Sequence, residues 1–476
     1  MIDYRIMEHS PRRVLSVSLL VLLNISMMAS LRQLPLVASY GLSAISYFCI
    51  VALVFLLPCA LVSAELATGW PKSGGIYIWV KEALGDRWGF FAIWMQWVHN
   101  IAWYPAIMSF IAATLAYVID PTLIENKEYV LTIVLVGFWG MTLLNYLGIK
   151  TSSWVSSIGV TAGTIAPGLL IILLGIIWLL IGNPSEMSFA KEGLLPDISN
   201  SSHLIFLSGL FLAFAGLEVS AAYAGNVKDP QKNYPKSIII AALVTFFLFM
   251  LGSLAIGIVI PKEKITLISG LMEAFHVFFN AYHLNWVLPP IAVLLVIGAA
   301  AEVNSWIVGP VKGLYATSIH GNLPPIFQKV NKHGTPTNLL LFQAIIVTIT
   351  SCVFLYMPSI NSSYWILTVL SSQSYLIMYI LMFIASIRLR YTKPHVPRAY
   401  RIPFPHKGIW IIASLGILAS LFAIGIGFLP LEELHIDNVL FYDLFLGIGL
   451  LLMCAIPLII YQMRKPSWFK NSKHES

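Results

Sequence analysis

The sequence predicts an all-α integral membrane protein with twelve transmembrane helices. The first reason is composition, because 58% of the 476 residues are hydrophobic and only 10% are charged. The second is that apolar runs of about 20 residues, the length that crosses a bilayer, recur to the end of the chain. The third is that the first and sixth of these runs are interrupted by polar residues, which predicts two broken helices.

The apolar stretch from Val14 to Ala67 is too long for one crossing and predicts two spans. Span one contains the polar run from Ser26 to Gln33, which includes Arg32, so we expect it to be interrupted there. A turn near Gly41 separates it from span two, at about 44–67. A short cytoplasmic half-helix is expected to follow span two. The other spans are expected at about 88–118, 129–148, 154–182, 203–224, 236–260, 286–316, 337–357, 363–388, 408–429 and 439–462. The segment 265–282 is amphipathic and too polar to cross, so we expect an external loop helix.

The distribution of positive charge gives the orientation. With the N-terminus inside, the external segments hold only four of the 28 Lys and Arg residues, namely Lys127, Lys191, Lys262 and Lys264. This is the pattern of the positive-inside rule and indicates cytoplasmic loops, not a nucleic-acid-binding face. We therefore expect both termini in the cytoplasm and no nucleic-acid partner.

The stretch Phe211–Lys236, FLAFAGLEVSAAYAGNVKDPQKNYPK, is the feature around which the chain is organised. Its apolar part carries Ala215, Gly216 and the carboxylate of Glu218. A charge at that depth costs about 2.5–3.5 kcal/mol, so it normally faces a cavity or a partner. Either a packing face with Glu218 bonded to a neighbouring helix or a discontinuous helix at a midplane site explains the pattern, and we favour the second.

Broken spans one and six occupy equivalent places if spans one to five and six to ten are repeats. Five is odd, so the second repeat enters the membrane from the opposite side and the repeats are inverted. The predicted organisation is a cytoplasmic N-terminus (1–13), an inverted-repeat core (14–390), a cytoplasmic loop with spans eleven and twelve (391–463), and a short tail (464–476).

Four stretches carry a resemblance to a known family: Phe211–Lys236, Met28–Ser43 (MASLRQLPLVASYGLS), Ala64–Ile93, and Ala301–Thr317 (AEVNSWIVGPVKGLYAT). They resemble the amino acid–polyamine–organocation superfamily, and within it the glutamate/γ-aminobutyrate antiporter branch. The resemblance implies a LeuT-like fold of twelve spans and an alternating-access transporter in a bacterial inner membrane. It implies exchange of an amino acid such as glutamate for a related amino acid or its decarboxylation product.

Carried over by motif, the resemblance places substrate near Glu218, Glu302, Trp306, Tyr375 and Tyr379. From the residues themselves we add the interruptions, that is, Arg32 in span one and Ala215 and Gly216 in span six. Two features depart from the family pattern. Span one has no glycine at its interruption, and only residues 464–476 follow the last span, which we expect to be too short to close the cytoplasmic path.

The charged residues of the predicted site each allow two roles. Arg32 either binds a substrate carboxylate or forms a permanent pair with Glu218. Glu302, near Asn304 and Ser305, is either a neutral structural donor or the proton carrier of a coupled mechanism. His99 is expected to be a packing histidine.

The same features are compatible with functions other than exchange. A proton-coupled symporter is the alternative, and a non-transporting amino-acid sensor is a further one. No nucleophile elbow, phosphate loop or metal-ligand spacing occurs, so we expect no enzyme, no metal and no cofactor. The expected partners are the amino-acid substrate and the lipid bilayer, and the sequence gives no oligomeric state.

Overall fold

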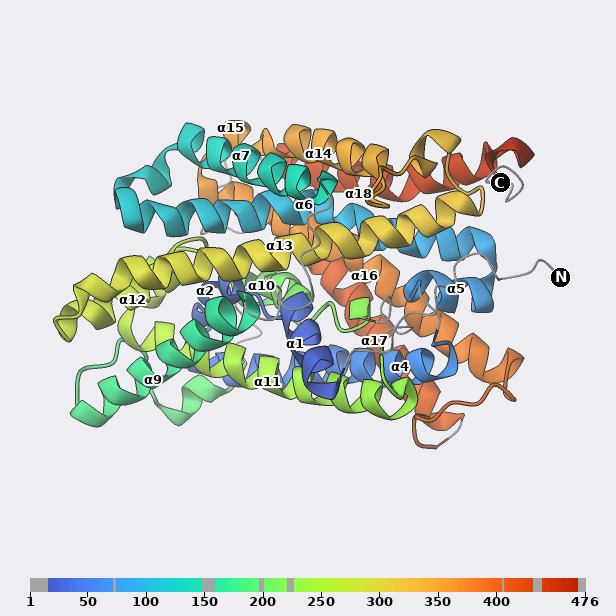
Figure 1. The fold of residues 1–476 in the computed structure, drawn as a ribbon. Coiled ribbons are helices and arrows are strands. Elements are labelled where there is room, and N and C mark those ends of the chain that lie inside the picture. The colour runs from blue at the N-terminus through green and yellow to red at the C-terminus, as the bar shows by residue number, and fades with distance from the viewer. Residues whose placement is uncertain are drawn as a thin grey trace.

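The computed structural model describes residues 16–71, 74–147, 159–196, 201–220, 227–404, 406–430 and 439–469, and within these ranges the chain is helical and forms no strand (Figure 1). The helices are α1 Val17–Met28, α2 Leu34–Ala38, α3 Ala44–Val51, α4 Leu57–Gly69, α5 Ile76–Leu84, α6 Asp86–Ile119, α7 Lys127–Tyr146, α9 Ala166–Ile181, α10 Ser201–Ala213, α11 Pro230–Val259, α12 Gly270–Ala281, α13 Leu288–Ile319, α14 Thr337–Ser351, α15 Val353–Tyr356, α16 Ile360–Thr392, α17 Lys407–Ile426 and α18 Val439–Gln462.

Among the described residues, ten helices are long and apolar enough to cross a membrane, and the bent pair α1 and α2 makes an eleventh. At the place expected for span six stands the shorter apolar helix α10. The all-helical membrane architecture is therefore confirmed, with ten or eleven candidate spans where the sequence predicts twelve. The predicted half-helix after span two is α5, and the predicted amphipathic loop helix is α12. These two helices lie at opposite ends of the bundle (Figure 1).

The predicted interruption of span one is confirmed. Helix α1 ends at Met28, Ala29 and Ser30 have extended backbone angles, and the chain re-enters helical geometry through the 3₁₀ turn Leu31–Gln33. Helix α2 then carries Pro35 in its first turn, where the missing N–H costs no intrahelical hydrogen bond. The two halves meet at 40°.

The interruption of span six begins after α10 ends at Ala213. Gly216 has φ +117°, a backbone conformation that side chains with a Cβ rarely adopt. A Cβ placed on it would stand 2.5 Å from the carbonyl oxygen of Met27 and 3.4 Å from the Trp306 ring. The break of span six therefore touches the break of span one directly, and only a glycine allows this approach.

The long helices divide into enclosed and outward-facing ones. Most of the apolar windows of α6 and α16 are buried, whereas most of those of α7 and α18 are exposed, as expected for a lipid-facing surface. In Figure 1 the short helices α1, α2 and α10 lie in the middle of the bundle, among the long helices. The two broken spans are thus held inside a scaffold of unbroken helices.

Candidate functional site

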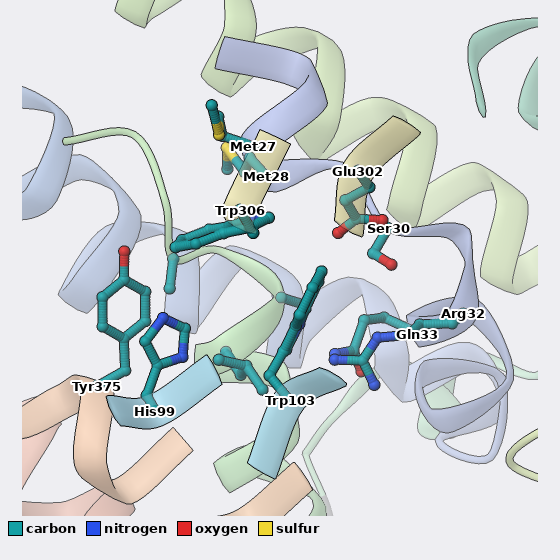
Figure 2. Close-up of a pocket in the computed structure, with 13 residues that line it drawn as sticks. Met27, Met28, Ser30, Arg32, Gln33, His99, Trp103, Glu302, Trp306 and Tyr375 are labelled. Carbon is teal, nitrogen blue, oxygen red and sulfur yellow. The ribbon is translucent and has the colours of Figure 1, made fainter. Parts of the chain in front are cut away.

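A small cavity of about 20 Å³ lies at the two breaks (Figure 2). This is room for about one water molecule, so the site is closed around its lining in this conformation. Its lining residues lie at the breaks of spans one and six and on the helices α6, α13 and α16. The lining residues are Met27, Met28, Ser30, Arg32, Gln33, His99, Trp103, Leu212, Ala213, Ala215, Glu302, Trp306 and Tyr375.

Four polar atoms of this lining have no hydrogen-bond partner among the described residues. They are Arg32 Nε, Gln33 Oε1, His99 Nε2 and Trp306 Nε1, and all four side chains are buried. A buried polar group without a partner costs about 1–3 kcal/mol, so native structures rarely leave one unpaired. Four of them around one cavity indicate a place built for a polar ligand.

The guanidinium of Arg32 is held in place by aromatic residues. Its Nη1 donates to the Tyr364 hydroxyl at 2.8 Å, and that hydroxyl donates to the Arg32 carbonyl oxygen at 3.3 Å. Its carbon atom lies 5.4 Å from the Tyr364 ring centroid and 5.7 Å from that of Trp103. The fork is therefore fixed before any ligand enters, with Nε still free to donate.

Glu302 faces the cavity beside Ser30 (Figure 2). Its carboxyl group interacts with the Ser30 hydroxyl and with the positive charge of Arg32. The expected neighbours on its own helix are occupied elsewhere: Asn304 Oδ1 accepts from Asn145 at 2.8 Å, and Ser305 Oγ donates to the Ala301 carbonyl. The cavity thus presents a guanidinium and a carboxyl group close together.

Glu218 lies behind the cavity wall, not in its lining. Its carboxylate accepts hydrogen bonds from the hydroxyls of Tyr375 and Tyr379 and from Gln96 Nε2, the last at 3.1 Å. The Tyr379 hydroxyl also accepts from the Gly216 backbone N–H at 2.7 Å. A permanent pair between Glu218 and Arg32, one of the two alternatives left open, is therefore absent from this conformation, because both groups have other partners.

The cavity is walled by a cluster of aromatic rings. His99 and Tyr375 stack with centroids 3.9 Å apart and an angle of 8°. Trp306 meets both edge-on, at 5.2 Å from His99 and 5.9 Å from Tyr375, and lies 5.8 Å from Trp103. Tyr379 stands behind Tyr375, at 5.0 Å.

The structure brings all eight predicted site residues to one place, five in the lining and three directly behind it, namely Gly216, Glu218 and Tyr379. Arg32, Ala215, Glu302, Trp306 and Tyr375 line the cavity. Sequence reasoning missed Trp103 and Gln33 as lining residues.

His99 was expected to be a packing residue. Its Nδ1 does bond Ser371 Oγ at 3.3 Å, but the residue lines the cavity and its Nε2 has no partner among the described residues. The signal available in the sequence was the polar pair His99-Asn100 within an otherwise apolar and aromatic span. No group of His, Cys, Asp and Glu that could hold a metal occurs in the part of the chain that the structure describes.

Comparison with known proteins places the chain among transport proteins. Residues 15–451 match the model of a family described as amino acid permease. An uncharacterized transporter of Legionella pneumophila is 44% identical, over 98% of both chains. A glutamate/γ-aminobutyrate antiporter of Lactococcus lactis is 32% identical over 93% of this chain and 89% of its own length. A probable agmatine/putrescine antiporter of the same species is 26% identical, over 83% of this chain and 84% of its own.

Proposed function

Because the chain belongs to the amino acid permease family, we propose that it exchanges amino acids across a bacterial inner membrane by alternating access. Membership makes it a multi-pass membrane transporter of amino acids or polyamines and not an enzyme. The finer assignment rests on one observation, the cavity at the two breaks with its unpartnered polar atoms.

The charges at the cavity favour an amino acid over a polyamine. Arg32 offers a cation for a carboxylate, and Glu302 offers an anion for an ammonium group. A zwitterion satisfies both, whereas a dicationic amine would face Arg32 and find Glu302 as the single carboxylate in the lining.

For the substrate pair, we propose an amino acid such as glutamate and a related amino acid or its decarboxylation product. Support comes from the Lactococcus relative named as a glutamate/γ-aminobutyrate antiporter and from the fixed guanidinium of Arg32. The fold assigned to this function has twelve spans: spans one to five and six to ten as inverted, LeuT-like repeats within 14–390, and spans eleven and twelve within 391–463. Span six comprises α10 and the residues that follow it. In this proposal both termini face the cytoplasm, which the distribution of Lys and Arg supports.

The test is uptake of a panel of labelled amino acids by purified protein in liposomes, with and without unlabelled amino acid trapped inside. Exchange predicts rapid entry only into preloaded vesicles. Equal entry into empty vesicles, driven by a pH gradient, would replace exchange with proton-coupled symport. Binding without entry under either condition would indicate a sensor.

A further inference from the structure

A second pocket, of about 360 Å³, lies between the loop that joins α16 to α17 and the start of α11. It is on the side that the charge distribution assigns to the cytoplasm. Its lining residues are Gln231, Pro394, His395, Val396, Pro397, Arg398, Ala399 and Arg401. Two arginines and a histidine are therefore present, and no carboxylate is among the lining residues. The substrate cavity shares none of these residues.

Arg398 is the built part of this pocket. Its side chain is only 2% exposed, and its guanidinium carbon lies 5.1 Å from the centroid of the Trp70 ring. Nη2 donates to the carbonyl oxygens of Leu389 at 3.0 Å and Lys393 at 3.2 Å. Nε and Nη1 have no hydrogen-bond acceptor within the described ranges. The guanidinium is thus fixed in place, and two of its nitrogen atoms are buried without a hydrogen-bond acceptor.

The nearby acid, Glu65, does not use up the positive charge. Arg390 Nε donates to Glu65 Oε1 at 2.9 Å and its Nη2 donates to Oε2, which also accepts from the Ile402 backbone N–H at 2.9 Å. Arg398 reaches this carboxylate only at 3.7 Å. One negative charge is therefore shared by two guanidinium groups, and Arg401 adds a third cation.

The electrostatic balance at Arg398 reflects this excess. Burial lowers the pKa of Arg398 from its usual value, Glu65 opposes that, and the charges of Arg390 and Arg401 lower the pKa further. Cations that destabilise one another in a partly desolvated place are relieved by a bound anion. The relief does not come from a lining side chain, since none is acidic.

We propose that this pocket binds a phosphate-bearing anion, either the headgroup of an anionic phospholipid of the inner leaflet or a free phosphate ester. The planar arginine fork matches phosphate geometry, and a site at the membrane-proximal loop meets the anionic surface of the cytoplasmic leaflet. The bound anion fixes loop 393–404 against α4, beside the pair of Glu65 and Arg390 that joins α4 to α16.

The test measures binding to the purified full chain in a neutral detergent, with dioctanoyl phosphatidylglycerol in one arm and inorganic phosphate in the other. Arg401→Gln removes an exposed lining cation and leaves Arg398 and Glu65 intact. Lys332→Gln, on the loop between α13 and α14, is the control with the same change of charge. We expect saturable binding that is about tenfold or more weaker in Arg401→Gln and unchanged in Lys332→Gln. Ala399→Asp, which places a carboxylate in the lining, should weaken binding as well and serves if Arg401→Gln does not fold.

The two arms identify the source of the anion. Binding of the lipid but not of inorganic phosphate assigns the site to a phospholipid, and binding of both assigns it to phosphate groups in general. Two results would overturn the proposal: no saturable binding in either arm, or an equal loss in Arg401→Gln and Lys332→Gln, which is the behaviour of unspecific surface attraction.

Discussion

Replacing Arg32 with Gln tests whether its guanidinium binds the carboxylate of the substrate. The variant loses a charged lining group whose Nε has no acceptor among the described residues, and hydrogen bonds to charged groups contribute about 1.5–3 kcal/mol. At 1.4 kcal/mol per factor of ten, the dissociation constant for a carboxylated amino acid should rise roughly 10- to 150-fold. A glutamine amide can still donate to Tyr364, so the fold should be retained.

The assay is calorimetric titration of the purified variant with an amino acid and with the amine that lacks its α-carboxylate. We expect the large loss for the carboxylated ligand and a change of less than about threefold for the amine, which is under one kcal/mol. Equal losses for the two ligands, with a lowered thermal stability, would show that Arg32 supports the fold and does not bind the carboxylate.

A double-mutant cycle separates this role from a bridge to Glu218. Because the structure gives Arg32 and Glu218 different partners, the stability losses of Arg32→Gln and Glu218→Gln should add to within about 0.3–0.5 kcal/mol. The bonded pair Glu65 and Arg390 is the positive control, for which we expect an interaction energy within the range of about 0.5–3 kcal/mol. If the double variant Arg32→Gln/Glu218→Gln regains stability that each single variant loses, Arg32 and Glu218 form an ion pair after all.

Three further outcomes are expected. Gly216→Ala places a Cβ 2.5 Å from the Met27 carbonyl oxygen on a backbone with φ +117°. The free energy of unfolding should therefore fall by at least about 1–3 kcal/mol, and transport should stop. Melting and uptake like those of the wild type would refute the contact between the two breaks. Trp306→Ala opens the aromatic wall and should abolish uptake at normal membrane expression, whereas Trp306→Phe should retain part of it; full activity of the Ala variant would make Trp306 a packing residue. Burial lowers the pKa of His320, and the charge of Lys81 lowers it further, so the folded state favours the neutral imidazole. The stability of the fold should therefore fall as the pH drops through about 6.5, the ordinary pKa of histidine. In His320→Gln the melting temperature should depend less on pH between about 7.5 and 5.5, and an unchanged slope would refute this.

The interruptions of both key spans could be predicted from the sequence because local chemistry marks them. A polar run around Arg32 cannot continue an apolar helix at that depth, and Gly216 with Glu218 marks a helix that must open or pack closely. The unbroken spans follow from hydropathy alone. With α1 and α2 counted as one span, the structure has one candidate span fewer than predicted because α10 is too short to count as one. It is short because it ends where the break of span six begins.

The partners inside the site could not be predicted, because they depend on how each helix is rotated about its axis. Glu218 is bonded by Tyr375 and Tyr379 from α16, over 150 residues away in the chain, and not by Arg32. Glu302 faces Ser30 across the bundle and not its sequence neighbours. The second pocket could not be predicted either, because basic loops are ordinary on the cytoplasmic side of a membrane protein. Only the tertiary structure shows that the side chain of Arg398 is buried.

The most direct test of the central claim is the initial rate of entry of labelled glutamate into glutamate-loaded vesicles, measured for the wild type and for Ala215→Leu. The larger side chain would occupy the cavity between the two breaks without removing a polar group. We predict rapid entry for the wild type and almost none for Ala215→Leu at matched protein content and melting temperature. Equal rates for the two proteins would place the transported amino acid somewhere other than the cavity between the two breaks.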